Sequence, residues 1–420
     1  MIYYLAKFIM SPAIWLYFRR SYFLGAGKIP REGPVIIIAN HAASFLDAMM
    51  MGVMLRRPIH YYTRSDVFRS RVARFIFGHL HMIPIYSQDL GKGELHRNAD
   101  SFDKGEEVLR RGGLLLIFPE GTSRIERNLL PMKKGVSRIA LQALQKSQDI
   151  DIVVVPVGIH YSRHVFRSGL QLVTGDPVPI RHYRELYREN TAKAVNQLTT
   201  ELEEHFEKVV LYVDQEGRTA LIETQLEMMD NDRGNQFQWE DFNAQKNMCG
   251  NISRLDDELS GRIEQMQDKY ISLLNQYQLH DRSFSKNKSI HLSFPALIVF
   301  LPLFAIGIVL NAIPYLFGRW MADKKVTRID FYTSVLVSVS AFGYLIWAVI
   351  WLSVAFMLNA WWLFPIILLS PLLCWFCLWW YDRYRDLFCH RQYKKLSKNE
   401  PELISALALI RQKITNLIPD

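Results

Sequence analysis

The sequence predicts an α/β domain with a mixed central sheet flanked by helices, followed by a helical segment and a C-terminal transmembrane helical region. Between residues 34 and about 180, apolar runs of strand length alternate with helical patterns, as in an α/β domain. No charged residue occurs from Leu292 to Gly318, nor in the 51 residues from Phe331 to Tyr381. A single spanning helix needs only about 20 apolar residues, so these gaps predict membrane segments.

Residues 1–30 predict a helix at a membrane interface. The apolar and aromatic runs 2–10 and 15–18 are interrupted by Ser11-Pro12 and closed by Arg19-Arg20. This stretch is short for a span, whereas aromatic rings suit the headgroup layer and the arginine pair suits anionic phosphates. A short span or a packed helix is the alternative.

Residues 31–190 supply the α/β domain. Each apolar run is bounded by Gly, Pro or Asp, and the first expected helix ends in basic residues before Gly112-Gly113. We expect strands at residues 35–39, 114–118 and 152–157, and helices at residues 101–113 and 135–145.

Charge is unevenly distributed along the chain. The net charge is +10 over residues 1–150, −6 over residues 151–290 and +5 over the remainder. A basic block near membrane segments favours anionic headgroups or phosphorylated substrates, and no nucleic-acid-binding motif accompanies it. A solvated basic face is the alternative.

The cysteines predict neither disulfides nor a metal site. Cys249, Cys374, Cys377 and Cys389 have no paired framework, which favours a reducing compartment. Cys374 and Cys377 form a C-x-x-C pattern, but it lies in an apolar run where packing is the expected role.

The stretch from Asn40 to Asp47 carries the clearest chemistry. Residues six apart point about 240° apart on a helix, so His41 and Asp47 can meet only if the chain bends between them. Ser44-Phe45-Leu46-Asp47 has the form of a capping box, which would start a helix at Phe45 and leave His41 in the preceding loop. Asp47 would then fix one imidazole nitrogen and leave the other to remove a proton from an alcohol.

Three sequence blocks resemble the glycerolipid acyltransferase family, which includes glycerol-3-phosphate and lysophosphatidate acyltransferases. Asn40 to Asp47, Phe118 to Ser123 and Val155-Pro156-Val157 look like the family's first, third and fourth blocks, and the match covers about residues 34–180. The resemblance implies that His41 is the general base, that Asp47 is its partner, and that Val155-Pro156 lines the acyl-donor side. It implies substrate binding by Glu120, Gly121 and Thr122, and we assign the next two residues, Ser123 and Arg124, to substrate binding as well. Family members use acyl-CoA or acyl-carrier protein and need no metal or prosthetic group.

The chain departs from the family pattern at two places. Five residues rather than four separate His41 from Asp47, and Ser87 stands where the second block usually has a phosphate-binding arginine. Either another cation binds the phosphate, or the acceptor lacks a phosphomonoester. The candidate cations, each of which could equally be a surface residue, are Arg64, Lys92, Arg97, Arg124 and Lys133. We favour Lys133, because Lys133-Lys134-Gly135 opens a predicted helix whose N-terminus suits an anion.

Residues 191–290 predict a helical linker domain with a structural or partner-docking role. The segment is polar and acidic, with apolar positions at helical spacing over residues 191–213 and 252–278.

The membrane region is assigned to residues 291–390, with a C-terminal tail at 391–420. Residues 294–317 contain three prolines and have Lys or Arg on both sides, which favours a re-entrant or kinked segment. A hairpin of residues 331–357 and 361–381 would follow and return Arg383 and Arg385 to the cytoplasm. Three full spans are the competing arrangement.

These observations predict a membrane-bound O-acyltransferase of glycerophospholipid synthesis. It would move a fatty acyl group from acyl-CoA or acyl-carrier protein to a hydroxyl of lysophosphatidate or glycerol 3-phosphate, without a metal. The alternatives are a non-phosphorylated lipid acceptor, or a membrane-anchored lipid-binding or scaffold protein with a degenerate site. We expect the catalytic domain to face the cytoplasm at a bacterial inner membrane, with the endoplasmic reticulum as the other compatible membrane.

Overall fold

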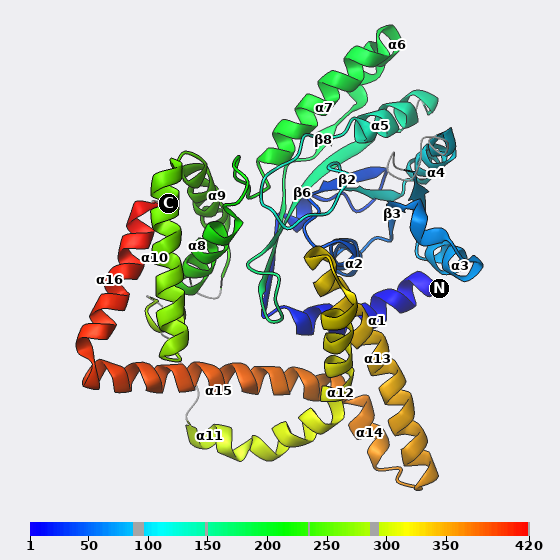
Figure 1. Cartoon of the computed structure of the whole chain (residues 1–420). Helices are drawn as coiled ribbons and strands as arrows, with labels where there is room; N and C mark the ends of the chain where they lie inside the picture. The colour runs from blue at the N-terminus through cyan, green and yellow to red at the C-terminus, as the bar shows by residue number, and fades with distance from the viewer. Residues whose placement is uncertain (87–95, 148–149, 234–235, 286–293, 419–420) are drawn as a thin grey trace. The chain divides into compact units, whose positions relative to one another are not determined.

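The computed structural model describes residues 1–86, 96–147, 150–233, 236–285 and 294–418. The chain divides into two compact units, whose elements are traced in Figure 1. The first unit comprises residues 1–125, 130–210 and 328–334. The second comprises residues 126–129, 211–327 and 335–420.

The first unit is built on an eight-stranded mixed sheet. The strand order is β1-β7-β6-β2-β5-β3-β4, and β8 pairs with β6. Strands β6, β2, β5, β3 and β4 run parallel to one another, whereas β7 and β8 are antiparallel to β6. The predicted α/β class with a mixed sheet is therefore confirmed. The strands are β1 (Arg20–Leu24), β2 (Val35–Ala39), β3 (Ile59–Arg64), β4 (Met82–Ile85), β5 (Leu114–Ile117), β6 (Val153–Tyr161), β7 (Gly169–Thr174) and β8 (Val178–Pro179).

Strand β2 lies in the middle of the sheet and is buried along its whole length. Its sequence is a continuous apolar run because helices cover both faces of a parallel sheet, so no position needs a polar side chain. The observed bounds of β2 are those predicted. Strand β6 continues to Tyr161, four residues beyond its predicted end.

Helices cover the sheet of the first unit on both sides. Helix α5 packs against α4 and α7, α1 packs against α2, and Figure 1 shows the strands between these two groups. Buried Ser137 of α5 and Thr199 of α7 share a hydrogen bond of 2.8 Å, so α7 belongs to this unit although we expected its residues in the linker domain. The helices are α1 (Ile2–Tyr17), α2 (Phe45–Met54), α3 (Arg71–His79), α4 (Asn98–Arg110), α5 (Gly135–Lys146), α6 (Arg184–Glu189) and α7 (Thr191–Glu207).

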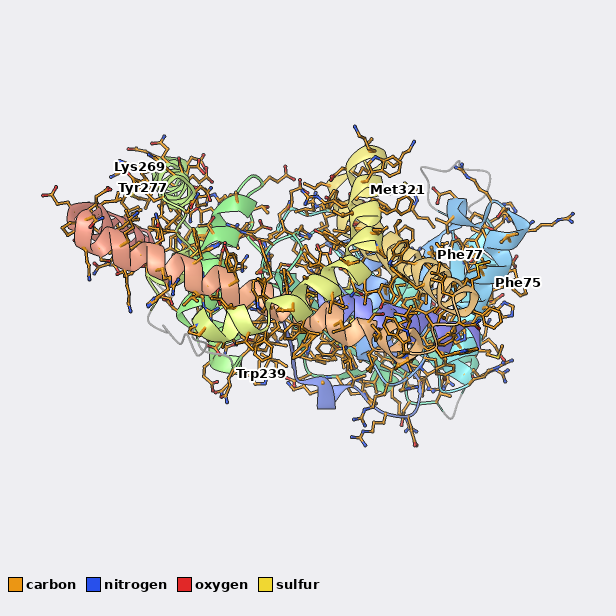
Figure 2. All side chains as sticks on the ribbon, turned by 90° about the horizontal axis from the view of Figure 1, so that it is seen from below. Phe75, Phe77, Trp239, Lys269, Tyr277 and Met321 are labelled. Atoms are coloured by element: carbon orange, nitrogen blue, oxygen red, sulfur yellow. The ribbon has the colours of Figure 1, made fainter. Side chains whose placement is uncertain are left out.

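Helices α1 and α3 of the first unit expose several apolar side chains. Helix α1 buries Tyr3, Met10 and Ile14 but exposes an aromatic and aliphatic stripe of Tyr4, Leu5, Phe8 and Trp15. Figure 2 labels Phe75 and Phe77 of α3. Phe77 packs against Phe68, whereas Phe75 is exposed.

The polar helices of the second unit surround a buried ionic cluster. The Arg411 guanidinium lies 2.8 Å from Asp281 and 3.0 Å from Asp232, and the Tyr270 hydroxyl donates to Asp281 at 2.8 Å. Residues 391–420, expected to form a tail, contain the end of α15 and helix α16, which carries Arg411 and packs against α10. The polar helices are α8 (Thr219–Asp232), α9 (Trp239–Ser253), α10 (Asp257–Gln276) and α16 (Pro401–Leu417).

Among the described residues, two helices are long and apolar enough to cross a membrane, α12 (Leu301–Lys325) and α13 (Ile329–Met357). The expected second arm of the hairpin, residues 361–381, is instead divided between α14 (Leu363–Leu368) and α15 (Ser370–Asn399). Pro371 occupies the first turn of α15, where its missing N–H costs least. A short helix, α11 (Phe294–Val299), precedes α12. Helix α13 begins inside the first unit, which includes its residues up to Ser334.

Candidate active site

Asn40 fixes the chain where β2 ends. Its side-chain amide donates to the Ile159 carbonyl at 2.8 Å, and its side-chain oxygen accepts from the Ile159 N–H at 2.6 Å. These two bonds replace the next rung of the ladder between β2 and β6, so the strand can stop without leaving buried backbone groups unpaired. The following residue, His41, is thereby held at the carboxyl edge of the parallel strands.

Helix α2 begins at Phe45, as predicted, but the predicted capping box is wrong. Ser44 has φ +51° and makes no side-chain cap, and its N–H donates to Ser123 Oγ at 3.1 Å. The Asp47 carboxylate instead accepts from the N–H of Ala43 at 2.8 Å. The donor to the Asp47 carboxylate is therefore the N–H of Ala43, one residue before the Ser44 N–H that a capping box would use.

His41 and Asp47 lie side by side, with Nδ1 of the imidazole 2.8 Å from Oδ2 of the carboxylate. The His41 ring stacks on Phe118, with ring centroids 3.9 Å apart and planes 11° from parallel. One nitrogen of His41 is engaged by Asp47, and the imidazole retains 20% exposure, which leaves Nε2 as the nitrogen that can meet a hydroxyl.

Asp47 is fully buried and is held by a third donor that the sequence did not indicate. The Tyr161 hydroxyl, at the end of β6, donates to Asp47 Oδ1 at 2.5 Å. Burial, with the negative charge of Asp47, raises the pKa of Tyr161 well above its ordinary value, so the phenol stays protonated. A buried carboxylate is tolerated only when its oxygens are paired, and here His41, Ala43 and Tyr161 supply the partners. Side chains alternate between the two faces of a strand, so Tyr161 shares a face with Val155, Val157 and Ile159. This alternation was the pattern in the sequence that could have indicated Tyr161.

The second predicted motif follows β5 and meets the first. Buried Glu120 accepts from the backbone N–H of His41 at 3.4 Å, and the backbone N–H of Arg124 donates to the His41 carbonyl at 3.0 Å. Burial raises the pKa of Glu120, while the charges of His41 and Arg124 act in the opposite direction. Glu120, Ser123 and Arg124 therefore share one edge of the sheet with His41 and Asp47, as the parallel pairing of β2 and β5 requires.

Lys133 lies against the Glu120 loop. Gly121 has φ +69°, and a Cβ added there would overlap the Lys133 ammonium group. The backbone N–H of Lys133 also donates to the Pro119 carbonyl at 3.0 Å. Exposed Lys133 thus presents its charge beside exposed Gly121 and Thr122, two residues before α5 begins.

The other cations expected at an anion site differ in their surroundings. Arg64 ends β3 and forms a half-exposed ion pair with Asp66, with Nη2 3.2 Å from Oδ2. Arg97 is exposed and its guanidinium lies 4.8 Å from the centroid of the Tyr86 ring. Ser87 and Lys92, which bear on the phosphate question, lie outside the described residues.

Comparisons with known proteins identify the domain that contains this edge of the sheet. Residues 21–160 match the family model described as Acyltransferase. Residues 21–160 therefore form an acyltransferase domain, and the predicted resemblance to the glycerolipid acyltransferases is confirmed.

The relatives come from several organisms. Glycerol-3-phosphate O-acyltransferase 2 of Saccharomyces cerevisiae is 36% identical over 103 residues, which are 24% of this chain and 14% of that protein. A 1-acyl-sn-glycerol-3-phosphate acyltransferase of Chlamydomonas reinhardtii is 24% identical over 143 residues, covering 33% of this chain and 38% of the relative. A solved structure, the lysophosphatidate acyltransferase PlsC of Thermotoga maritima, is 19% identical with a TM-score of 0.32 over 48% of this chain and 80% of that one. The chain thus spans well under half the length of these two sequence relatives.

Proposed function

We propose that this protein is a membrane-bound O-acyltransferase that acylates a hydroxyl of glycerol 3-phosphate or lysophosphatidate, with acyl-CoA or acyl-carrier protein as donor. The observation that carries the proposal is the 2.8 Å contact between His41 Nδ1 and Asp47 Oδ2 at the edge where the family's motifs meet. The relatives named above act on glycerol 3-phosphate and on 1-acylglycerol 3-phosphate by their names, which supports this substrate class.

In the proposed reaction, Nε2 of His41 removes the hydroxyl proton as the acceptor oxygen attacks the thioester carbonyl carbon. A new C–O bond forms, the C–S bond then breaks, and the leaving thiolate takes the proton from the imidazolium. Asp47 holds Nδ1–H toward itself and stabilises the imidazolium. General-base assistance of this kind contributes roughly 10²–10⁴-fold in rate.

Substrate binding is assigned to the loop from Glu120 to Arg124 together with Lys133. The Lys133 ammonium beside Gly121 and the side chain of Arg124 offer positive charge to the acceptor's phosphate, and the N-terminus of α5 favours an anion near the same place. Arg64 extends the positive charge along the same sheet edge. No metal or prosthetic group enters the proposal.

We place the acyltransferase domain on the cytoplasmic side of the membrane. Lys324 and Lys325 end α12 and Arg328 precedes α13, and positive residues between two spans favour the cytoplasm. Since Arg328 itself belongs to the first compact unit, that unit lies on the same side. The exposed stripe of α1 suits the headgroup layer. Labelling of Lys193→Cys on exposed α7 by an impermeant maleimide, in inverted but not in right-side-out vesicles, tests this orientation.

The activity is tested with purified full-length protein, acyl-CoA and acyl-carrier protein donors, and three acceptors: glycerol 3-phosphate, lysophosphatidate and monoacylglycerol. The expected result is acylation of a phosphate-bearing acceptor, lost in His41→Ala and kept in His79→Ala. His79 is the matched control because it is exposed and bonds only the backbone of its own helix in the structure described. Preference for monoacylglycerol would favour the non-phosphorylated alternative, and a fully active His41→Ala protein would defeat the mechanism.

A further inference from the structure

The start of helix α13 contacts the loop that carries His41 and Asp47, although nearly 290 residues separate them in the sequence. Residues 328–334 belong to the same compact unit as the acyltransferase domain. Ser334 is 2% exposed, and its hydroxyl accepts from the N–H of Leu46 at 2.9 Å and donates to the carbonyl of Ala43 at 2.7 Å. One hydroxyl thus bridges the two sides of the turn at Ser44.

This contact supplies a helix cap from a distant residue. The first N–H groups of a helix have no partner within the helix, and the residue at the N-cap normally provides a side-chain oxygen for one of them. Ser44 occupies the N-cap of α2 with φ +51° but makes no side-chain cap. The Ser334 hydroxyl takes over this role at the N–H of Leu46, which it shares with the carbonyl of Ala43 at 3.1 Å.

Other contacts of the same segment reach the second motif. Arg328 donates to the Ser123 carbonyl at 3.2 Å, and the Ser123 hydroxyl accepts from the N–H of Ser44 at 3.1 Å. The Arg328 guanidinium is itself held by Asp330, at 2.8 Å. Phe331 packs edge-on against Phe45, with ring centroids 5.7 Å apart. Residues 328–334 therefore touch both loops that form the candidate active site.

We propose that Ser334 is a positioning residue for catalysis, which holds the His41–Asp47 loop in its productive shape. This inference rests on the proposed function. Asp47 lies in the first turn of α2 and accepts from the N–H of Ala43, whose carbonyl is bound by Ser334. Without the Ser334 hydroxyl, Ala43 and Leu46 are joined only by their own backbone bond of 3.1 Å, so the turn can move and shift the carboxylate that orients His41. A displacement of about 1 Å at a catalytic group lowers the rate by up to roughly 10²-fold.

The length of the loop between His41 and Asp47 explains why a contact that holds the loop is needed. Five residues separate His41 from Asp47, and the turn at Ser44 places a side chain in a backbone region that L-amino acids rarely adopt. Such a conformation persists only when the surrounding structure holds it. Ser334 on one side and Ser123 on the other provide the bonds that hold it.

The test compares full-length Ser334→Ala, Ser334→Thr and Ser353→Ala. The control, Ser353, is on the same helix, but its hydroxyl donates to Val349 of that helix at 2.9 Å. We expect Ser334→Ala to lower kcat by roughly 10- to 100-fold with both KM values within about twofold, because the loop orients the base without binding substrate. Ser334→Thr, which keeps the hydroxyl, should restore most of kcat, and Ser353→Ala should match the parent protein.

Thermal unfolding of each variant separates positioning from folding. Wild-type kcat in Ser334→Ala overturns the inference, as does a loss confined to KM. If Ser334→Ala does not fold, Ser334→Thr decides: a folded protein with near-parental kcat supports the role, and a folded protein with a kcat at least tenfold lower overturns it. His41→Ala is measured in the same series, because activity in that variant defeats the proposed function itself, whereas inactive His41→Ala with fully active Ser334→Ala defeats only the role of Ser334.

Discussion

The Tyr161 hydroxyl donates to Oδ1 of Asp47 at 2.5 Å, while the other oxygen of the same carboxylate lies 2.8 Å from Nδ1 of His41. The carboxylate is thus oriented from both sides, by a tyrosine at the end of β6 and by the histidine that follows β2. Because β2 and β6 are neighbouring parallel strands, the sheet itself sets the distance between these two groups.

Removing the phenolic hydroxyl should weaken both the fold and the reaction. In Tyr161→Phe the buried carboxylate of Asp47 loses one of its donors, and a hydrogen bond to a charged group contributes about 1.5–3 kcal/mol. We expect a lower unfolding midpoint and a fall in kcat of roughly tenfold, because Asp47 gains freedom to turn away from His41. Steady-state kinetics and thermal unfolding measure the two effects. Tyr187→Phe on α6 is the control, and equal behaviour of the two variants would contradict a role for Tyr161.

Replacing the carboxylate by an amide should change the tautomer of the imidazole. In Asp47→Asn the side-chain NH₂ can donate to Nδ1 of His41, which puts the ring proton on Nε2 and removes the base. We expect kcat to fall by roughly 10⁴-fold with little change in KM, as in the serine protease triad on which this estimate is based. Asp151→Asn, at the exposed pair with Arg181, is the matched control. A loss of less than about tenfold would mean that Asp47 does not set the tautomer.

The sequence was sufficient to predict the central strands and the loop between them because that information is local. The continuous apolar run of Val35–Ala39 predicts a strand buried on both faces, and the family resemblance placed His41 and Asp47 in one site. The start of α2 at Phe45 was also predicted. Its cap was not, because the left-handed backbone of Ser44 follows from tertiary contacts and not from the residue type.

Two residues beside the candidate site were missed for the same physical reason. Tyr161 reaches Asp47 only because β6 pairs with β2 and continues beyond its predicted end. Ser334 reaches α2 only because the first turn of an apolar helix packs into the acyltransferase domain. In both cases the sequence separation exceeds 100 residues, and the apolar pattern that assigned Ser334 to a membrane segment concealed its polar contact. The same pattern concealed the helix break at Leu369.

Buried Glu120 should make the stability of the protein depend on pH in a specific direction. Burial raises the pKa of Glu120 in the native state above 4.5, its ordinary value, which applies to the unfolded state. At pH values between the unfolded-state pKa and the native-state pKa, the native state therefore binds more protons than the unfolded state. Stability therefore falls as pH rises through this window and stays lower above it. We expect Glu120→Gln to unfold at a higher temperature than the parent protein at pH 7, and the difference to shrink as pH approaches 4.5.

Glu107→Gln is the control with the opposite sign. Arg110 and Arg111 lower the pKa of exposed Glu107, so its contribution to stability is present above the ordinary value of 4.5 and is lost as pH falls. The amide should lower the unfolding midpoint slightly at pH 7, with no difference in acid. Unfolding midpoints are recorded from pH 4 to pH 8 for both variants and the parent protein. As pH rises, the midpoint of Glu120→Gln should move above that of the parent protein and the midpoint of Glu107→Gln should move below it. A parallel pH dependence would contradict the assigned effect of burial on Glu120.

Lys133 should affect binding of the acceptor's phosphate more than the chemical step. Its ammonium group is the atom nearest to a Cβ built at Gly121, whereas Lys134 is also exposed and supplies none of the three nearest atoms. A charge-assisted hydrogen bond to phosphate contributes about 1.5–3 kcal/mol, so Lys133→Ala should raise the KM for a phosphate-bearing acceptor roughly 10- to 100-fold and leave kcat within about threefold. Lys134→Ala should change neither constant by more than about twofold.

The comparison is repeated with monoacylglycerol, for which the two lysine variants should behave alike because no phosphate is present. If Lys133→Ala raises the KM equally for all acceptors, Lys133 does not bind the acceptor's phosphate but contributes to binding of the acyl donor or to the structure of the loop. Arg64 or Arg124, at the same edge of the sheet, would then be the phosphate-binding residue.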